Sequence, residues 1–452
     1  MQSKHITVIG AGPAGSLLSI YLARRGYRMT VYERRPDLRR VEIPAGRSIN
    51  LALANRGIHA LAEIGLLDQV NKLLIPMRGR MIHAEGGALQ LQPYGHRPHE
   101  VIYSVSRSAL TALLMDAAEA TGQVEIRFNQ SCQGADLERR LLIFQEEIGQ
   151  ARQEVAFERV IGCDGVQSRV RGAILQATSG HCADEPLEHS YKELSIPPGP
   201  NQSFRMEANA LHIWPRGEYM LIALPNLDSG FTATLFLPNE GEQGFSMLTT
   251  EAQVSAFFNE QFPDTLALMP RIKEEFFSHP TGRLSTIRTT PWHFRDEAVI
   301  LGDAAHAIVP FHGQGMNCAF EDCSAFHQCL ARFGEDWDSV FAEFEAMRKP
   351  NADAIADLSL ENYVEMRSTV RDPRFQLKKE LAWRLEDRHP DRFIPRYSMV
   401  MFHRIPYAEA KRRGVIQDEI LEMLTEDIHD LDKVDYALAS RLIEERLGGE
   451  SV

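Results

Sequence analysis

The hydrophobic and polar positions at the start of the chain follow a strand, helix, strand order. Residues 6–9 form a short apolar, β-branched run, which predicts a buried strand. Residues 16–25 carry apolar side chains at helical spacing, and residues 29–32 form a second apolar run that ends on Glu33. The pattern predicts that the chain opens with a βαβ unit.

A glycine-rich turn joins the first predicted strand to the helix. Gly10 permits a tight turn, Gly12 lets a pyrophosphate approach bare backbone, and Gly15 lets the helix sit close to the strand. The helix N-terminus then offers N–H groups and partial positive charge to the phosphates. Glu33 is placed to accept hydrogen bonds from a ribose diol. The alternative is an ordinary glycine turn, but the flanking strands, helix and acid together favour dinucleotide binding.

Alternation of apolar and polar residues also predicts a hairpin and an inserted sheet. Residues 77–84 and 88–93 flank a Glu-Gly-Gly turn, which is typical of a hairpin. Folding at that turn brings Arg80 close to residues 92–94, so Arg80 and Tyr94 are candidate cross-strand neighbours. Residues 185–285 alternate in short segments that Pro and Gly separate, which predicts an antiparallel sheet.

Helical periodicity is clear over residues 106–120, with Ser106 as a candidate N-cap. Arg107 follows in the first turn, where its charge opposes the helix dipole. Arg107 is either an exposed arginine, or an arginine whose repulsion by the helix dipole is offset by an external anion such as the cofactor pyrophosphate. Its position in the helix does not decide between these two interpretations.

Residues 298–301 return to a buried strand pattern, followed by Gly302-Asp303 and a long predicted helix to about residue 333. Gly315 gives a flexible entry to this helix and places Met316 and Asn317 at its N-terminus, which stabilises negative charge on a bound ring. His306 and His312 precede the helix. They are interpreted as hydrogen-bonded structural histidines, because no metal-ligand spacing surrounds them.

From residue 339 onward the pattern is helical, with separate helices predicted over residues 340–347, 351–369, 376–384, 408–413 and 418–424. Asn362, Glu365 and Met366 lie at i, i+3 and i+4, so they share one helix face. A packing face with a polar edge has the same pattern.

Composition narrows the class of partner. The length of 452 residues indicates two to three domains, and the formal charge of −13 disfavours nucleic acid and anionic membranes. Six cysteines are scattered without a CxxC pair, which predicts reduced thiols. The chain enters its first strand at once and contains no apolar run of transmembrane length. We therefore expect a soluble, cytoplasmic protein. The sequence does not give its oligomeric state, for which a homodimer is one candidate.

Three motifs together resemble the single-component FAD-dependent aromatic hydroxylases. These are the glycine turn with Glu33, the segment Cys163-Asp164-Gly165 after a predicted strand, and Gly302-Asp303 before residues 310–317. In that family the second motif serves FAD and the nicotinamide cofactor. The aspartate of the third contacts the ribityl chain, and the following helix points at the pyrimidine edge of the flavin.

Within that family, the similarity is closest to the kynurenine 3-monooxygenases, and it extends to about residue 405. It is carried by residues 46–53, 75–83, 93–95, 104–107, 310–318, 361–366 and 395–397. The resemblance implies that the amino-acid end of L-kynurenine is held by Arg80, Tyr94, Asn362 and Tyr397. It implies that the pocket is completed by Glu365, Met366, Phe311, His312 and Gln314. It also implies FAD contacts at Ala14, Glu33, Arg34, Arg35, Ala52, Arg107, Cys132, Asp303, Met316 and Asn317.

The implied fold is an α/β protein with a Rossmann-like FAD-binding domain, an inserted antiparallel sheet for substrate and a C-terminal helical region. The predicted boundaries are residues 1–75, 100–180 and 286–338 for FAD, 76–99 and 181–285 for the sheet, and 339–452 for the helices. Membrane-bound family members end in a hydrophobic anchor, whereas this chain ends in the polar stretch 441–452. The membrane location is therefore not expected here.

The implied reaction is hydroxylation of L-kynurenine to 3-hydroxykynurenine through a flavin hydroperoxide. It consumes NADPH and O2 and needs no catalytic side chain and no metal. NADPH is expected to bind transiently, because no second glycine fingerprint appears. Two alternatives remain: a flavin hydroxylase of another aromatic acid, and a flavin-binding redox sensor or interaction protein without hydroxylase activity.

Overall fold

The computed structural model describes residues 4–41 and 50–448, so residues 46–49 of the resembling segment lie outside the described residues. The chain divides into two compact units. The first comprises Met1–Leu74, Val105–Leu187 and Arg283–Ala356. The second comprises Ile75–Ser104, Glu188–Gly282 and Asp357–Val452. The domain boundaries expected from the sequence stay a prediction.

The first unit is built on a six-stranded sheet with the order β18-β19-β12-β1-β2-β8. Its strands are β1 (His5–Ile9), β2 (Arg28–Tyr32), β8 (Val124–Arg127), β12 (Val160–Gly162), β18 (His293–Phe294) and β19 (Ala298–Ile300). Neighbouring strands pair in parallel, except for the antiparallel pair of β18 and β19. The parallel α/β pattern expected from the apolar runs is confirmed.

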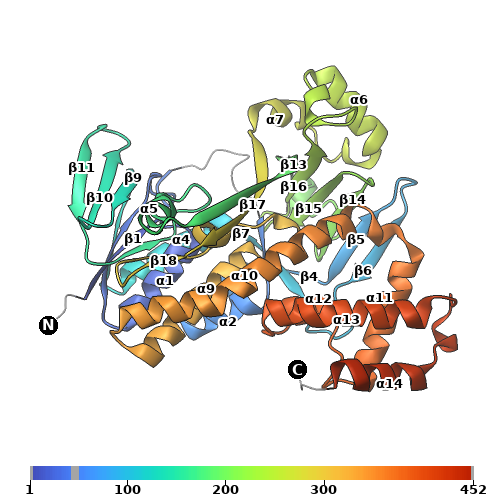
Figure 1. Cartoon of the computed structure of the whole chain (residues 1–452). Helices are drawn as coiled ribbons and strands as arrows, with labels where there is room; N and C mark the ends of the chain where they lie inside the picture. The colour runs from blue at the N-terminus through green and yellow to red at the C-terminus, as the bar shows by residue number, and fades with distance from the viewer. Residues whose placement is uncertain (1–3, 42–49, 449–452) are drawn as a thin grey trace. The chain divides into compact units, whose positions relative to one another are not determined.

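Helices pack around this sheet, and α9 contacts both α1 and α2 (Figure 1). The helices are α1 (Pro13–Arg24), α2 (Asn55–Glu63), α3 (Leu67–Asn71), α4 (Arg107–Ala120), α5 (Arg169–Thr178), α8 (Asp303–His306) and α9 (Gly315–Phe333). Apolar residues at helical spacing over residues 56–70 predict a single helix there, and that prediction is wrong. The chain forms α2 and α3 instead, because Gly65 between them adopts a φ of +64°.

Four further strands belong to the first unit. They are β3 (Asn50–Leu53), β9 (Gln130–Asp136), β10 (Leu141–Glu146) and β11 (Arg152–Ala156). The last three form an antiparallel sheet that the sequence analysis did not predict. β9 matters for the site because it carries Cys132.

The second unit contains most of a seven-stranded sheet with the order β17-β13-β16-β15-β14-β5-β6. Its strands are β5 (Gly79–His83), β6 (Leu89–Pro93), β13 (His181–Ile196), β14 (Ala210–Pro215), β15 (Met220–Pro225), β16 (Phe231–Pro238) and β17 (Thr281–Thr290). β13 and β17 continue into the first unit. The predicted sheet is present, but it is mixed rather than antiparallel, because β14 and β5 pair in parallel.

One face of this sheet packs against α6 (Glu251–Gln261) and α7 (Ile272–Ser278). The core there is aromatic and aliphatic, with Trp214, Leu235 and Phe258 fully buried. The unit also holds the short strands β4 (Ile75–Met77) and β7 (Ile102–Ser106), which pair antiparallel.

The β5–β6 hairpin sets the position of Arg80. Its register pairs Arg80 with Gln92 and Gly79 with Pro93. The predicted closeness of Arg80 to residue 92 is confirmed. Tyr94 is not directly opposite Arg80, but lies just past the end of β6, where its N–H donates to the Arg78 carbonyl at 3.0 Å.

The chain closes with helices α10 (Trp337–Arg367), α11 (Pro373–Arg388), α12 (Arg396–Met401), α13 (Tyr407–Thr425) and α14 (Tyr436–Leu447). Two of the predicted boundaries are wrong. The two helices predicted over residues 340–347 and 351–369 are one continuous helix, α10, which contains Pro350 and ends at Arg367. A proline removes one backbone hydrogen bond and does not by itself end a helix. The segments 408–413 and 418–424 likewise belong to one helix, α13. Among the residues that the structure describes, no helix has both the length and the hydrophobicity required to cross a bilayer.

Candidate active site

The glycine turn between β1 and α1 is built by close backbone contacts. Gly10 has a φ of +98°, and a Cβ on it would lie 2.4 Å from the Cys163 carbonyl oxygen. A Cβ on Gly15 would lie 2.0 Å from the Gly10 carbonyl oxygen, so only glycine fits at either position. A Cβ on Gly12 would meet no atom within 4 Å. The space beside Gly12 is therefore open, as an approaching pyrophosphate requires.

Five helices of this unit, α1, α2, α3, α8 and α9, begin without a side-chain cap, whereas α4 and α5 have one. α4 and α5 are capped by Ser106 and Ser168, whose hydroxyls accept hydrogen bonds from backbone N–H groups in the first turn. The N-cap prediction for Ser106 is thereby confirmed. α1 and α9 have no side-chain cap, and Gly12 and Gln314 occupy their N-cap positions. The first N–H groups of α1 and α9 are left to bind an anion from outside the chain.

A carboxylate fixed by hydrogen bonds, that of Glu33, lies just after the end of β2. Glu33 is almost fully buried, and its Oε2 accepts the Ala11 N–H at 2.9 Å. Its Oε1 accepts from the backbone N–H of Arg35 at 3.0 Å and from the Arg35 Nε at 2.8 Å. Burial acts to raise the pKa of Glu33, but these hydrogen bonds outweigh it and hold the pKa below its usual range. Glu33 is thus ionised and fixed beside the glycine turn, while Arg34 is exposed.

The Asp164 carboxylate lies at the start of α5. It accepts hydrogen bonds from the Ser168 hydroxyl at 2.5 Å and from the Arg169 N–H at 2.6 Å. Burial raises the pKa of Asp164, and burial beside Asp164 also raises the pKa of the Cys132 thiol on β9, to about 12. Asp164 and Cys132 are therefore close enough to interact electrostatically. The hydrogen bonds of Asp164 fix the start of α5. Arg107 is the first residue of α4.

The start of α9 is locked to the end of β3 by one amide side chain. Asn317 is fully buried, and its Oδ1 accepts the Ala54 N–H at 2.9 Å. Its Nδ2 donates to the carbonyls of Ala52 and Gly313, both at 2.8 Å. The predicted cofactor residues Ala52 and Asn317 thus meet each other. The Asn317 side chain is used within the protein, so its backbone N–H is the group available to a ligand.

The remaining predicted cofactor residues of this unit lie at helix starts. Asp303 is exposed at the first position of α8, and Met316 follows Gly315 at the start of α9. The Ala14 carbonyl accepts the Cys323 thiol at 3.5 Å, which joins α1 to α9.

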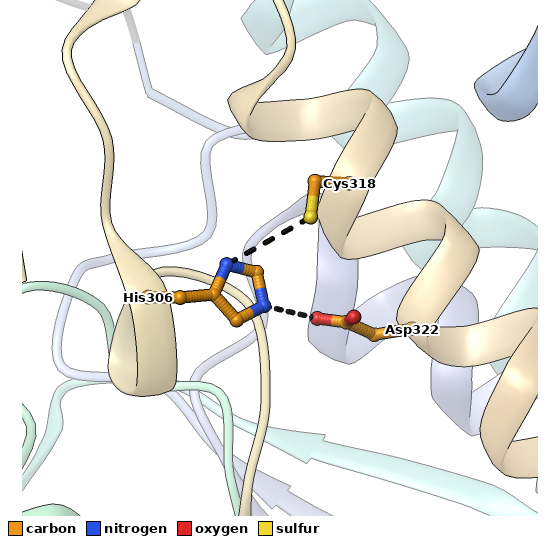
Figure 2. A group of neighbouring side chains, drawn as sticks. All are labelled: His306, Cys318 and Asp322. Atoms are coloured by element: carbon orange, nitrogen blue, oxygen red, sulfur yellow. Dashed lines mark hydrogen bonds and ion pairs between the residues drawn. The ribbon is translucent and has the colours of Figure 1, made fainter. Parts of the chain in front are cut away.

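Behind these helix starts lies a buried charged cluster (Figure 2). His306, at the end of α8, contacts Cys318 and Asp322 of α9, with 2.6 Å between His306 Nε2 and Asp322 Oδ2. The same Asp322 carboxylate accepts the Gly302 N–H at 2.9 Å and the Arg348 Nε at 2.7 Å. One carboxylate therefore joins the Gly302 turn, α8, α9 and α10.

The His306–Asp322 pair is ionic. Burial acts to lower the pKa of His306, but the Asp322 carboxylate raises it well above its ordinary value. In turn, His306 and Arg348 hold the pKa of Asp322 well below its usual range. His, Cys and Asp are metal ligands in other proteins, but Arg348 brings a second positive charge to this carboxylate, so a metal ion would be repelled. His306 is buried and hydrogen-bonded, as expected for a structural histidine.

The residues of the first unit fit the dinucleotide part of FAD. The fit rests on the open space at Gly12, the uncapped starts of α1 and α9, and the ionised carboxylate of Glu33. Individual contacts of the predicted residues with the cofactor stay a prediction.

The second unit holds a different kind of site, centred on Arg80. Only 4% of Arg80 is exposed. Its NH1 donates to Glu365 Oε1 at 2.5 Å, and its NH2 donates to Asn362 Oδ1 at 3.2 Å. Burial acts to lower the pKa of Arg80, but Glu365 raises it above its ordinary value. The hairpin and α10 thus bring three of the predicted substrate residues together.

Two tyrosines flank the same guanidinium. The rings of Tyr94 and Tyr397 stack with centroids 5.6 Å apart, and the Arg80 guanidinium lies 5.8 Å and 5.4 Å from their centroids. Burial raises the pKa of Tyr94 to about 12, so its hydroxyl keeps its proton at neutral pH. Among the described residues, neither the Tyr94 hydroxyl nor the Arg80 Nε has a hydrogen-bond partner. Both are buried donors that an anionic ligand would satisfy.

The other predicted substrate residues divide between the units. Met366 is buried on α10 in the second unit. Phe311, His312 and Gln314 are buried in the first unit, where residues 310–312 form a short 3₁₀ turn before α9. Their role around the substrate stays a prediction.

Lys379 was missed by the sequence analysis. It lies on α11, and its Nζ donates to the Pro93 carbonyl at 2.6 Å, next to Tyr94. Burial and the nearby Arg80 charge lower the pKa of Lys379 to about 8. A signal was available: Lys379 precedes Ala382 and Glu386 by three and seven residues, which places a lysine on the buried face of the helix.

Comparison with known proteins places the chain in a family. The model of a family described as an FAD binding domain matches residues 4–359. The kynurenine 3-monooxygenase of Myxococcus xanthus (strain DK1622) is 49% identical over 443 residues, which are 98% of this chain and 95% of the relative. The kynurenine 3-monooxygenase of Stenotrophomonas maltophilia (strain K279a) is 47% identical, over 98% of this chain and 97% of the relative.

Solved structures share the fold at lower identity. A tetrameric form of 2-methyl-3-hydroxypyridine-5-carboxylic acid oxygenase matches with a TM-score of 0.67 and 19% identity, over 82% of this chain and 95% of that one. Pseudomonas aeruginosa PqsL in complex with 2-aminobenzoylacetate matches with a TM-score of 0.62 and 20% identity, over 81% of this chain and 98% of that one. The glycine turn, the family model and the near full-length relatives agree: this chain carries an FAD binding domain and belongs to the kynurenine 3-monooxygenase family.

Proposed function

We propose that this protein is an FAD-dependent, NADPH-consuming monooxygenase that hydroxylates L-kynurenine to 3-hydroxykynurenine. The observation that carries the proposal is the buried Arg80, which pairs with Glu365, together with two unpartnered donors, its own Nε and the Tyr94 hydroxyl. Membership in a family of kynurenine 3-monooxygenases supports L-kynurenine as the substrate of this site.

The site suits the amino-acid end of the substrate. The carboxylate of an amino acid accepts charge-assisted hydrogen bonds from Arg80 and a hydrogen bond from the Tyr94 hydroxyl. Its ammonium group is attracted to the Glu365 carboxylate and to the amide oxygen of Asn362. A simple aromatic acid has no ammonium group, so it would leave Glu365 without that partner. This difference favours an amino acid over a hydroxybenzoate.

The first unit supplies the surroundings of the cofactor. FAD, when bound, provides the electron transfer and oxygen chemistry of hydroxylation. The uncapped N-terminus of α9 stabilises negative charge that lies close to its first N–H groups. The buried amide of Asn317 and the carboxylate of Asp322 hold that helix start and the Gly302 turn in place. The chain's own residues thus bind, orient and stabilise charge.

Further features of the proposal are that Phe311, His312 and Gln314 complete the substrate pocket and that NADPH binds transiently. The protein is proposed to act in the cytoplasm. Homodimer formation stays a prediction.

One assay tests the proposal. The purified protein should be yellow with FAD, and L-kynurenine should accelerate NADPH consumption and yield a product heavier by one oxygen atom in mass spectrometry. 4-Hydroxybenzoate serves as the comparison substrate and should give neither effect. A colourless protein that does not take up FAD, or NADPH consumption without an oxygenated product, would refute the proposal.

A further inference from the structure

A cavity of about 610 Å3 lies beside the β5–β6 hairpin in the second unit. Its volume is within the range of small-molecule sites. Its lining includes Ile82, Glu85, Gln90, Val370, Arg371 and Gln376. These residues come from the hairpin, from the short turn before α11 and from the first turn of α11.

The hairpin connects this cavity to the Arg80 site. Side chains two residues apart on a strand share a face, and the register pairs Arg80 with Gln92 and Ile82 with Gln90. The cavity therefore begins one cross-strand pair away from Arg80, on the same face of the hairpin. Exposure rises along this face: Arg80, Gln92 and Ile82 are buried, whereas Gln90 is exposed. The face leads from the buried guanidinium to solvent.

Unsatisfied amide groups lie at or beside the inner end of the cavity. Gln92 donates from Nε2 to the Val370 carbonyl at 3.0 Å, which fastens the hairpin to the opposite wall. Among the described residues, the Gln92 Oε1 and the Gln376 Nε2 are buried and have no hydrogen-bond partner. Of these two residues only Gln376 lines the cavity, so the wall offers one unpartnered donor. A buried polar atom without a partner costs free energy unless a ligand or water satisfies it.

The outer end is charged, and the rest of the lining combines apolar side chains with the polar Gln90, Asp372 and Gln376. Arg371 and Glu85 form an ion pair at 3.1 Å whose side chains are about half exposed. Between the two ends lie Ile82, Pro215 and Val370. A ligand that matches this lining has a positive group, a negative group and an apolar body. An aromatic amino acid has all three.

We propose that this cavity is an outer subsite for the aromatic amino-acid substrate on its way to Arg80. This inference rests on the proposed function. The zwitterion exchanges with the exposed Arg371–Glu85 pair, its ring lies against the apolar wall, and Gln376 donates to its carbonyl or carboxylate oxygen. Passage to Arg80 then requires the Gln92–Val370 hydrogen bond to open.

The first test is kinetic and uses the FAD-bound enzyme. Q376M removes the unpartnered donor with little change in volume, and R371Q removes the outer cation. Each is expected to lower kcat/KM for L-kynurenine about fivefold, the loss of one hydrogen bond, while kcat stays within about twofold because the Arg80 site is intact. The matched control is R374Q, since Arg374 pairs with Glu422 and does not line the cavity. An unchanged kcat/KM in both Q376M and R371Q, or an equal loss in R374Q, would overturn the inference.

A second test isolates the outer subsite. In an R80M enzyme, saturation-transfer NMR should still detect weak binding of L-kynurenine, and the combination R80M/R371Q should abolish it. Persistence of the signal in the combined variant, or its absence in R80M that retains FAD, would overturn the subsite. Failure of the proposed function is distinguishable, because it appears in the unmodified enzyme as the absence of an oxygenated product.

Discussion

The site of the first unit is made of backbone, and the site of the second unit is made of side chains. Around Gly10–Gly15 and the start of α9, the groups offered to a ligand are N–H groups and open space. Around Arg80, they are a guanidinium, a carboxylate, an amide and two phenols. In the proposed function, the cofactor is held mainly by backbone groups, whose positions do not depend on rotamers. The substrate is held by side chains, which substitution can tune.

The two constructions also differ in how they respond to change. A backbone site is sensitive where a side chain cannot be accommodated, and tolerant elsewhere. A buried cluster of charged side chains is sensitive at each member, because loss of one partner leaves another charge unpaired. Substitutions in the two units should therefore differ both in the size of their effect and in the property that they change.

The largest effect is expected at a buried charged cluster of the first unit, where side chains and not backbone groups carry the structure. D322N removes the carboxylate that holds His306, Arg348 and the Gly302 N–H. Because it leaves buried positive charge uncompensated, it should lower the free energy of unfolding by about 3–5 kcal/mol. Urea unfolding of the FAD-bound protein measures this change, and the exposed Asp338, changed to Asn, is the control.

The pH dependence of D322N has a defined sign. The pKa of Asp322 is lowered by folding, so its stabilisation is present above its unfolded value of about 4 and is lost only as pH falls below that. The pKa of His306 is raised by folding, so its stabilisation lasts until pH rises through that raised value. The difference between the two proteins should therefore persist from pH 5 to 7. Equal stabilities at pH 7 would contradict the role of the cluster.

The glycine turn offers two variants that separate folding from cofactor binding. G15A places a Cβ 2.0 Å from the Gly10 carbonyl oxygen and should destabilise the protein by about 3 kcal/mol. G12A places a Cβ in open space, so thermal unfolding of the apoprotein should be unchanged. Its affinity for FAD should nevertheless fall about tenfold, because the Cβ occupies the approach of the pyrophosphate. Titration of the apoprotein with FAD gives the affinity, and a G12A protein with normal affinity would place the pyrophosphate elsewhere.

The Arg80 site should respond in the opposite way, with loss of substrate and not of cofactor. R80M should raise the KM for L-kynurenine by one to three orders of magnitude, roughly 1.5–4 kcal/mol for a lost charge-assisted pair. The FAD content of the purified protein should stay normal. R271M, at an exposed arginine of the same unit, is the control. An unchanged KM would remove Arg80 from the substrate site.

This contrast explains which parts of the site could be predicted from the sequence. The glycine turn requires fixed residues at fixed spacing within one βαβ unit, so Gly10, Gly12, Gly15 and Glu33 were found from pattern alone. The Ser106 cap is likewise a local signal, and the structure confirms it. Such features can be predicted because they depend only on residues that are close together in the sequence.

The Arg80 site could not be predicted in this way. Its members come from β5, from the residue after β6, from α10 and from α12, and no local rule connects them; Arg80 and Glu365 alone are 285 residues apart. The hairpin register brought Tyr94 near Arg80, but Asn362 and Tyr397 were assigned only through the family resemblance. The continuity of α10 through Pro350 was missed for a related reason, since tertiary packing overrides a local helix-breaking signal.

The smallest expected effect concerns Lys379, which sharpens the view that the substrate site is tuned by charge. Because the pKa of Lys379 is about 8, it is charged at pH 7 and loses its proton as pH rises toward 9. Its attraction for an incoming carboxylate should disappear over the same interval. The ratio of kcat/KM between the unmodified enzyme and K379M should be about threefold at pH 7, a typical value for a partly exposed charge pair, and approach one at pH 9. Titration of the substrate affects the unmodified enzyme and K379M equally, so the ratio of their kcat/KM values depends on Lys379 alone. K379R keeps its positive charge at pH 9, so its kcat/KM should stay above that of K379M at that pH. If the ratio of kcat/KM between the unmodified enzyme and K379M is constant from pH 7 to 9, Lys379 only packs against Pro93.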